Sequence, residues 1–433
     1  MTRVTTVERL GQCVGETVTL KGWIHKLTSK GKLHFVTLRD GTGYAQCVLF
    51  QKAVPSELFL AVGDAGQESS LILTGEVKAD DRAPGGFEMS VEAGRVLQAV
   101  HDFPITPKEH GADFLLSRRH LWLRSKRQWA ILRVRDAVIT AIRGFFDERG
   151  FLCVDSPMFT PAACEGTSTL FEVDYFEDDK AFLTQSGQLY ADASALAFGK
   201  VYCFGPTFRA EKSKTRRHLT EFWMLEPELA FADLEDVMQL AEDLTVHIVR
   251  EVLRRRGTEL EALERDLSKL ECIQGGFPRI TYEEASAILL EHPESEFVAG
   301  DDFGAPDETI LSNMHEQPLL ITCYPKRIKA FYMKQDPQDP SKVLCVDMLG
   351  PEGVGELIGG SQREEDLDTL LAAIRAHALP MEEFEWYLDL RRFGSVPHAG
   401  FGLGLERTVA WICGIEHIRE TAPYPRMMSR IRP

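Results

Sequence analysis

The sequence has no apolar run near the roughly 18 to 20 residues that a membrane-spanning helix needs. Its N-terminal segment, MTRVTTVERLGQ, lacks the apolar core of a secretion signal. The nine cysteines are scattered, with no C-x-x-C pair and no histidine-spaced cluster, which disfavours structural zinc and a disulfide framework. We therefore expect a soluble protein of a reducing cytoplasm, with no membrane partner.

Basic residues are fewer than acidic ones, and the formal net charge is −17. Phosphate neutralisation supplies most of the affinity in sequence-blind nucleic-acid binding, so that function is disfavoured. A specific contact through a local basic face remains open. The 433 residues are too many for one ordinary core, and 44% hydrophobic with 27% charged residues is typical of a globular protein. Two or three domains are expected.

Within residues 17–98, five short β-like runs alternate with turn signals such as Asp40-Gly41. A longer excursion around Gly63 precedes the fourth run. This pattern predicts an OB-type β-barrel over residues 1–100. The segment HDFPITPKEHGAD, with two prolines and a glycine, predicts a hinge or linker over 101–125, which leaves 126–433 as the second domain.

The second domain opens with apolar residues at spacings of three and four from residue 127 to 149, which predicts an amphipathic helix ended by Gly150. Strands and helices alternate irregularly after it, which favours an α+β fold over a doubly wound sheet. Residues 233–270 predict two charged helices broken near Gly257. Their charge is most simply a solvated face.

Residues 207–228 read TFRAEKSKTRRHLTEFWMLEPE, two extended runs separated by a basic loop. If 218–226 is a strand, its period of two puts His218, Phe222 and Glu226 on one face. Arg209 and Glu211 would share a face of the preceding strand. A nucleotide needs such an aromatic plate, carboxylate and cations. On spacing alone, an exposed hairpin with ordinary ion pairs is the alternative.

Three alternating glycines, Gly400, Gly402 and Gly404, lie in HAGFGLGLERTVAWICGI. In a strand they would clear side chains from one face and let a flat ligand approach the backbone. Arg407 follows at the start of an apolar helical run, placed to meet a phosphate or stack on a ring. Taken alone, the alternation also fits tight packing.

Together these segments resemble motifs 2 (207–228) and 3 (400–414) of the class II aminoacyl-tRNA synthetases. The shared pattern is F-R-x-E, a loop, H-x-x-x-F-x-x-x-E and, far downstream, G-x-G-x-G-x-E-R. Motif 1 (around 127–161) corresponds to the predicted helix and RGFLCVDSPMFTP, with Pro157 as its proline. The resemblance implies an α+β catalytic domain with a mainly antiparallel sheet flanked by helices. It also implies a homodimer formed through motif 1.

The resemblance further implies how ATP is bound. Arg209 would hold the α-phosphate, and Glu211 would contact the adenine. Phe222 would stack on the adenine while Arg407 closes its other side. Arg209, Glu211 and Arg407 are thus the expected catalytic residues. The expected ATP-binding set, in which Arg217 or His218 reaches the γ-phosphate, comprises Arg209, Glu211, Arg217, His218, Leu219, Phe222, Glu356, Gly404 and Arg407.

Almost the whole chain resembles the aspartyl/asparaginyl/lysyl subgroup, nearest its asparaginyl branch. Ala191 stands where aspartyl enzymes place a lysine that pairs with the substrate carboxylate. Glu226 replaces their typical aspartate and could accept a hydrogen bond from a side-chain NH2, while Arg363 resembles the family arginine that donates to the side-chain oxygen. Donor and acceptor on opposite sides would read an amide by its two ends. The resemblance implies an asparagine-binding set of Glu165, Ser186, Gln188, Glu226 and Arg363.

For Arg363, a surface salt bridge with Glu364 or Glu365 is the alternative. In the subgroup context Glu165 would hold the substrate α-amino group as its loop closes, with Gln188 assisting. A site that leaves a buried group unpaired with the wrong ligand can discriminate by a factor on the order of 10⁴.

Asp347 and Glu356 lie in CVDMLGPEGVGELIGGS, and their carboxylates could converge from strand ends. By resemblance they hold Mg²⁺ on the ATP phosphates, with Ser361 nearby. The implied reaction first forms asparaginyl-adenylate from ATP and L-asparagine. It then transfers the amino acid to tRNA(Asn), with no covalent enzyme intermediate.

On the predicted barrel, Phe35 is exposed if Val36 and Leu38 fill the interior, and an exposed aromatic there is a stacking platform. In the subgroup the positions of Phe35 and Gln46 engage the central anticodon base. The alternative places Phe35 in the core and Gln46 at a solvated edge. The segment after Trp23 lacks the arginines of bacterial aspartyl enzymes, so contacts to the other anticodon bases are not carried over.

Three competing functions stay open on sequence. The nearest is an aspartyl-tRNA synthetase, including a non-discriminating one. A second is a paralogue that adenylates asparagine without tRNA, although such relatives lack the anticodon barrel. A third is a catalytically dead RNA-binding module, which the intact Arg209, Glu211, Asp347, Glu356 and Arg407 disfavour.

Overall fold

The computed structural model describes residues 2–161, 163–164, 169–176, 179–213 and 215–433. The chain divides into two compact units, Met1–Leu116 and Ser117–Pro433. This division falls inside the segment 101–125 predicted as a linker, where the chain forms two short helices, α2 (Ala112–Ser117) and α3 (Arg119–Trp122). Among the described residues, no helix has the length and apolar character to cross a bilayer.

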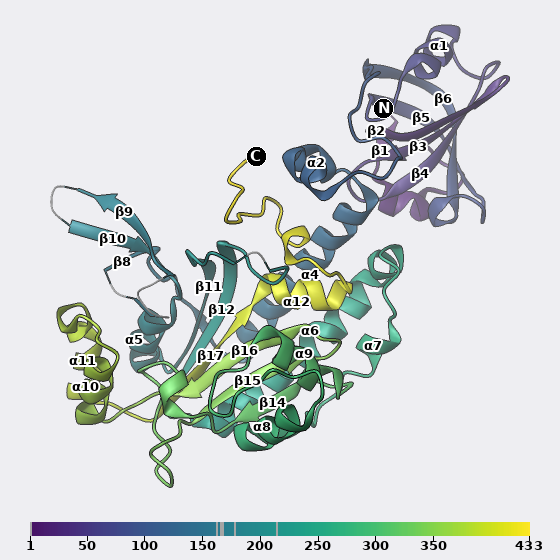
Figure 1. The fold of residues 1–433 in the computed structure, drawn as a ribbon. Coiled ribbons are helices and arrows are strands. Elements are labelled where there is room, and N and C mark those ends of the chain that lie inside the picture. Colours follow the sequence, from purple (N-terminus) through teal and green to yellow (C-terminus); the bar gives the residue numbers. More distant parts are fainter. Residues whose placement is uncertain (1, 162, 165–168, 177–178, 214) are drawn as a thin grey trace. The chain divides into compact units, whose positions relative to one another are not determined.

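The first unit, fully described from residue 2, is a β-barrel (Figure 1). Its strands follow the order β1-β2-β3-β4-β6-β5, and a further pairing of β2 with β5 closes the barrel. The long β2 pairs with β5 through its first half and with β3 through its second half. The predicted OB-type barrel is therefore confirmed. Its elements are β1 (Arg3–Val4), β2 (Thr17–Lys30), β3 (Leu33–Arg39), β4 (Tyr44–Phe50), α1 (Ser56–Asp64), β5 (Ser70–Ala79) and β6 (Phe87–Gln98).

The second unit is built on a large sheet, which in the described residues runs in the order β13-β14-β15-β16-β17-β12-β11-β7. All neighbours are antiparallel except the outermost pairs, β13–β14 and β11–β7. The predicted α+β fold with a mainly antiparallel sheet is thus confirmed. The strands are β7 (Leu152–Cys153), β11 (Lys200–Phe208), β12 (Glu221–Ala230), β13 (Arg279–Thr281), β14 (Leu319–Thr322), β15 (Cys345–Gly350), β16 (Gly355–Gln362) and β17 (His398–Gly404).

A smaller antiparallel sheet of order β8-β10-β9 comprises β8 (Phe159–Thr160), β9 (Phe171–Tyr175) and β10 (Asp179–Leu183). The α-helices that follow α3 in the second unit are α4 (Lys126–Glu148), α5 (Gln188–Phe198), α6 (Leu234–Ala262), α7 (Ser268–Glu271), α8 (Tyr282–Glu291), α9 (Ala305–Asn313), α10 (Leu367–Ala376), α11 (Glu385–Arg392) and α12 (Leu405–Cys413).

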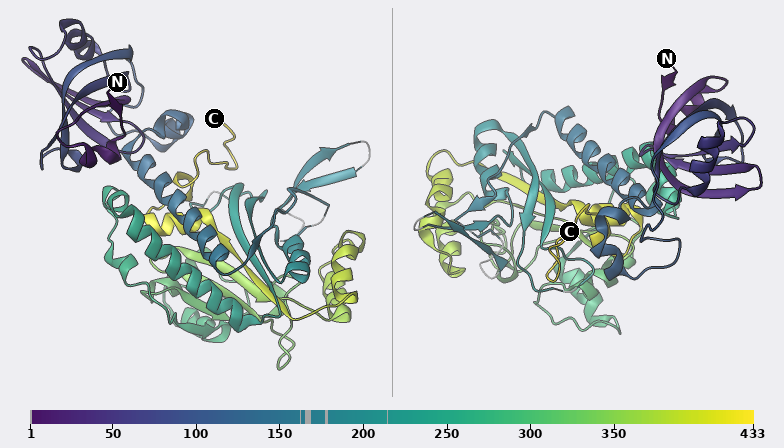
Figure 2. Two further views of the ribbon diagram at one scale, coloured as in Figure 1. Left: turned by 180° about the vertical axis from the view of Figure 1, so that it is seen from behind. Right: turned by 90° about the horizontal axis from the view of Figure 1, so that it is seen from above.

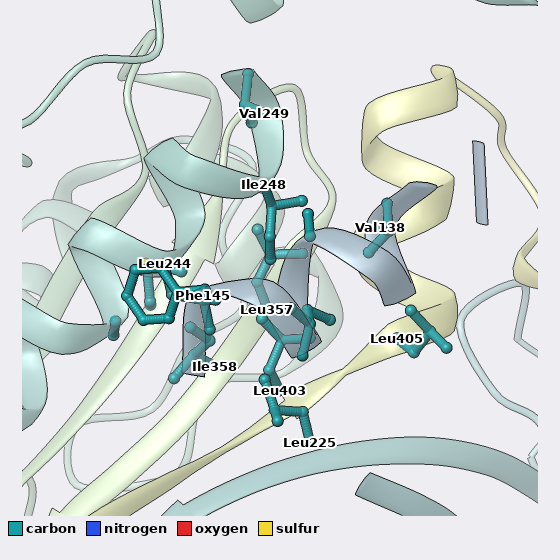
Figure 3. Packing of buried hydrophobic residues seen from close by; sticks show 14 of the residues in the cluster. Val138, Phe145, Leu225, Leu244, Ile248, Val249, Leu357, Ile358, Leu403 and Leu405 are labelled. Carbon is teal, nitrogen blue, oxygen red and sulfur yellow. The ribbon is translucent and has the colours of Figure 1, made fainter. Parts of the chain in front are cut away.

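One face of the large sheet is covered by α4 and α6, which cross in front of the strands when the molecule is seen from behind (Figure 2). Their apolar stripes pack onto side chains from β12, β16 and β17, and Figure 3 shows Phe145 and Leu244 packed beside Ile358. α4 matches the predicted amphipathic helix, and Gly150 follows it with φ +73°, a backbone conformation that glycine adopts without strain.

The two helices predicted within 233–270, broken near Gly257, are confirmed. Along α6 two helical segments meet at a kink, where Arg256, next to Gly257, departs from helical geometry with φ −134° and ψ 23°. The short α7 follows them. A buried stripe that includes Leu244 and Ile248 packs the first segment against the sheet.

Cross-strand register determines which residues lie on the other face of the sheet. Asp347 pairs with Gly359, and Gly359 with Gly402, so these three residues share one face. The intervening residues, among them Ile358 and Leu403, face α4 and α6. On β12 the same alternation turns the side chains of Phe222, Met224, Glu226 and Glu228 away from the helices.

Candidate active site

A cavity opens where β12 and β17 meet the start of α12. It contains all of the residues that the sequence predicted to bind ATP. Gly402, from the predicted glycine strip, also lines it, as do Met224, Leu357, Glu406 and Ile418, which were not predicted. The predicted members are Arg209, Glu211, Arg217, His218, Leu219, Phe222, Glu356, Gly404 and Arg407.

An aromatic ring and two arginines form the centre of this cavity. The Arg209 guanidinium carbon lies 5.4 Å from the centroid of the Phe222 ring. Arg407, in the first turn of α12, donates a hydrogen bond to the backbone carbonyl of Glu356. Glu406 fixes that turn, because its carboxylate accepts a hydrogen bond from the Trp223 N–H at 2.9 Å and forms an ion pair with Arg135 at 2.8 Å.

Two predicted strand positions are wrong. β11 ends at Phe208, so Arg209 and Glu211 lie in the loop that follows it. β12 begins only at Glu221, so His218 precedes the strand, while Phe222 and Glu226 share a face of it as predicted. His218 still lines the cavity together with Glu211, and its Nε2 lies 3.3 Å from Glu211 Oε2.

The loop that carries Arg217 is tied to α9. Arg217 donates hydrogen bonds to Glu308 at 3.3 Å and to Thr309 Oγ1 at 2.6 Å, as well as to the Gly353 carbonyl. Burial lowers the pKa of Arg217, although Glu308 opposes the shift. These contacts hold a cation at the edge of the cavity, where a triphosphate chain would extend.

Not every glycine of β17 leaves space for a ligand beside the backbone. A Cβ at Gly400 would lie 2.2 Å from Glu228 Cδ and 2.3 Å from the Pro227 carbonyl oxygen. At Gly402 it would lie 2.6 Å from the end of Met224, and only at Gly404 would it meet nothing closer than 4.0 Å. The prediction of a bare ligand-facing strip is therefore wrong at Gly400, where the absent side chain makes room for a buried carboxyl.

Asp347 and Glu356 converge, as predicted, over Gly359. A Cβ at Gly359 would lie 2.6 Å from Glu356 Oε1 and 3.7 Å from Asp347 Oδ1. Burial raises the pKa of Glu356 to about 7, and Asp347 adds to the rise. The buried Lys329 donates a hydrogen bond to Asp347 Oδ2 at 2.6 Å. The pair is thus a site that favours a cation.

This donor set fits Mg²⁺, which prefers one or two carboxylates together with phosphate oxygens. Among the described residues, no group of three or more acidic, histidine or cysteine side chains is arranged to hold a metal alone. The predicted third member, Ser361, is engaged elsewhere, because its hydroxyl accepts a hydrogen bond from Arg363 at 2.7 Å.

Further along β12, Glu226 is buried, with 3% of its surface exposed. It accepts hydrogen bonds from the Ser186 hydroxyl, from the Gly187 N–H at 2.8 Å and from Cys203 Sγ at 3.3 Å. Ala191 is fully buried against Cys203, so the position of the family lysine offers no cation to Glu226. Glu226 is therefore a carboxylate acceptor among small neighbours, with no cation at position 191.

Arg363 is buried, with 1% of its surface exposed. Its Nε donates to Glu228 Oε2 at 3.2 Å, and one terminal nitrogen donates to the other Glu228 oxygen. The alternative surface pair is excluded, because Glu365 pairs with Lys334 and the side chain of Glu364 accepts backbone N–H groups. Arg363 is thus an interior residue whose guanidinium binds Glu228 on one side and Ser361 on the other.

Gln188 and Glu165 complete the predicted amino-acid set. Gln188 starts α5, is 7% exposed, and its Nε2 makes no hydrogen bond to any described residue. Leaving such a donor unpaired costs about 1–3 kcal/mol, which favours a ligand acceptor at that place. Glu165 lies outside the described residues.

On the barrel, Val36 and Leu38 are fully buried, and Phe35 and Thr37 face outward, half-buried. Gln46 pairs with Thr37 and Val48 with Phe35, so Phe35 and Gln46 lie on one outer face. The Gln46 amide donates to Glu88 at 3.1 Å. The alternative of Phe35 in the barrel core is wrong.

A sequence profile of the family described as tRNA synthetases class II (D, K and N) matches residues 111–428. The chain belongs to this family. A second profile, of the OB-fold nucleic acid binding domain, matches residues 18–97.

Within the family, the chain is 58% identical to the asparagine–tRNA ligases of Koribacter versatilis and Sorangium cellulosum. The alignments cover 99% and 97% of both chains, respectively. The structure of asparaginyl-tRNA synthetase from Pyrococcus horikoshii, complexed with asparaginyl-adenylate, is 45% identical. It covers 100% of both chains with a TM-score of 0.96.

Three charged residues of this class II synthetase were missed from the sequence. Glu228 follows Glu226 by two positions, so the strand period that placed Glu226 could have identified it. Asp192 and Lys329 carry no local signal, since each reaches its partners through tertiary contacts.

Proposed function

We propose that the protein is an asparagine–tRNA ligase, which activates L-asparagine with ATP and transfers it to tRNA(Asn). The observation that carries the amino-acid assignment is a pair of buried groups of opposite charge, Glu226 on β12 and Arg363 just after β16. Glu226 is an acceptor for an amide NH2, and Arg363 is a donor for the amide oxygen. The names of the most similar relatives support the same substrate.

In the first step, a carboxylate oxygen of asparagine attacks the α-phosphorus of ATP. The bond to the bridging oxygen breaks, and pyrophosphate leaves. Phe222 and Arg407 hold the adenine between a ring and a guanidinium plane, and Arg209 neutralises charge on the α-phosphate. Because no covalent enzyme intermediate is needed, positioning and charge neutralisation account for the rate.

Asp347 and Glu356 would hold Mg²⁺, which when bound neutralises and orients the phosphates. Lys329 keeps Asp347 in place through its 2.6 Å hydrogen bond. Arg217, anchored on α9, and His218 provide cationic or donor groups along the phosphate chain.

In the second step, the 3′-terminal ribose hydroxyl of tRNA attacks the activated carbonyl, and AMP leaves. Gln188, whose buried amide donor lacks a described partner, would bind the amino acid beside Ser186. The outward pair of Phe35 and Gln46 would stack on and read the central anticodon base.

The proposal includes a homodimer formed through motif 1. β7 is an end strand of the large sheet, so its outer edge has no partner strand among the described residues. Exposed apolar side chains lie there and just beyond, at Leu152, Met158 and Phe159. An unpaired edge with apolar neighbours favours association.

Two assays test the assignment. ATP–pyrophosphate exchange is expected with asparagine and not with aspartate, and the purified protein is expected to charge tRNA(Asn) but not tRNA(Asp). Exchange with aspartate alone would refute the asparagine assignment. Exchange without charging of either tRNA would refute the ligase assignment.

Replacing Gln46 with alanine is expected to lower kcat/KM for tRNA(Asn) in charging about 10- to 100-fold, because a base edge loses its hydrogen-bonding partner. Asparagine-dependent exchange should not change. Gln51→Ala, at an exposed turn after β4, is the matched control and should leave charging intact. An equal loss in both variants, or a loss of exchange in Gln46→Ala, would contradict the anticodon role.

A further inference from the structure

Behind Arg363 lies a buried cluster of charged side chains that the proposed mechanism does not use. Asp192, from α5, is 0% exposed, and its Oδ1 lies 4.0 Å from the Arg363 Nε. The same Oδ1 makes no hydrogen bond to any described residue. Glu228, also 0% exposed, binds Arg363 from the β12 side. Two carboxyl groups therefore face one guanidinium.

The rest of the cluster holds Asp192 in place. The Tyr387 hydroxyl of α11 donates a hydrogen bond to Asp192 Oδ2 at 2.6 Å, and Arg391 donates to the same hydroxyl at 3.1 Å. His398 Nε2 lies 4.0 Å from Asp192 Oδ2 and 3.3 Å from Arg391. Asp192 is thus fixed by a neighbouring helix and strand, not by the pocket itself.

The protonation states support an ionised Asp192. Burial raises the pKa of Glu228 well above its ordinary range, and burial lowers the pKa of His398. For Asp192, burial alone would raise the pKa, but the nearby His398 and Arg363 outweigh it and the pKa is lowered. Asp192 is therefore the carboxyl of this pair that keeps its negative charge behind Arg363.

We infer that Asp192 is a specificity-determining residue: its buried carboxylate offsets the charge of Arg363, so that the site accepts an uncharged amide and rejects a carboxylate. An amide oxygen needs a hydrogen-bond donor but adds no charge. An aspartate side chain would bring another carboxylate to a guanidinium that is already matched, with Glu226 close by.

This inference rests on the proposed function, since it concerns which amino acid the Arg363 pocket accepts. Asp192 touches no substrate in this account, so it acts through Arg363 as a positioning and charge-balancing residue. A merely structural Asp192 would serve only to accept the Tyr387 hydrogen bond. Charge and hydrogen bonding can be separated, because asparagine at position 192 keeps the acceptor oxygen and removes the charge.

The test is Asp192→Asn in the full-length protein, with ATP–pyrophosphate exchange measured for asparagine and for aspartate. The ratio of kcat/KM for asparagine to that for aspartate is expected to fall roughly 10- to 100-fold, the size of one charge interaction in a partly polar interior. The change should come from a lower KM for aspartate. The KM for ATP should stay as in the wild type.

Tyr387→Phe is the matched control, because it removes the hydrogen bond to Asp192 and leaves every charge in place. The ratio of kcat/KM for asparagine to that for aspartate should be the same in Tyr387→Phe as in the wild type. An unchanged ratio in folded Asp192→Asn, or an equal fall in Tyr387→Phe, would overturn the inference.

Should Asp192→Asn not fold, Asp192→Ser removes the same charge with a smaller side chain. Failure of both to fold would assign Asp192 a structural role and overturn the inference as well. Different results would refute the proposed function and the role of Asp192. A wild type that exchanges only with aspartate refutes the proposed function, whereas an asparagine-specific wild type with an unchanged variant ratio refutes only the role of Asp192.

Discussion

Arg209→Ala is expected to lower kcat/KM for asparagine-dependent ATP–pyrophosphate exchange by about 10³-fold, the scale of losing a group that stabilises charge in the transition state. Arg209 lies in the loop after β11, over the ring of Phe222 at 5.4 Å, in the cavity that gathers the other predicted ATP ligands. The positive charge of Arg209 is needed most in the transition state, when the α-phosphorus is partly bonded to both the attacking and the leaving oxygen. The loss should therefore appear mainly in kcat, measured at saturating ATP and asparagine.

Arg216→Ala is the matched control for Arg209. Arg216 lies in the same loop, is exposed, and pairs with Glu416 at 2.6 Å. An exposed ion pair contributes about 0–1 kcal/mol, so neither exchange nor stability should change much. A comparable loss of exchange in both variants would mean that Arg209 acts through the charge of the whole loop and not through a contact with ATP.

Arg363→Ala has the second large effect, expected in asparagine binding and in stability at once. Without the guanidinium, the amide oxygen loses its donor, and kcat/KM for asparagine should fall by roughly 10³-fold or more while the KM for ATP changes little. Glu228 and Asp192 would remain buried without their cation, which costs about 3–5 kcal/mol in the free energy of unfolding. Urea unfolding measures the second effect independently of the first.

For this variant, Arg392→Ala is the control. Arg392 lies on α11, pairs with Glu385 and Asp389, and keeps 34% of its side chain exposed. It should lose no more than about 1 kcal/mol. If Arg363→Ala impaired ATP and asparagine binding equally, the guanidinium would be a general support of the active site and not a reader of the side chain.

Local patterns were enough to predict much of this protein. The glycine after α4, the five β-runs of the barrel and the alternation along β12 are short-range properties, because side-chain direction in a strand depends only on position in the chain. The whole predicted ATP set lines one cavity for a related reason. Its residues lie in a few short segments whose types already match the chemistry of a nucleotide.

The break near Gly257 was also a local signal, and two helical segments of α6 meet at a kink there. Gly400, in contrast, predicted a ligand-facing backbone, yet the space beside it holds Glu228. There a residue with a known local preference makes room for a side chain that is distant along the chain.

The sequence by itself determined the two domain types, the shared face of Phe222 and Glu226 on β12 and the class of chemistry, since these follow from periodicity and residue type. Only the tertiary structure decided which strands are neighbours. That arrangement places Arg363 against Glu228, 135 positions away, brings Asp192 behind them and sets Lys329 beside Asp347. A buried charge has to find its counter-charge wherever the sheet register brings one, and no local pattern specifies that register.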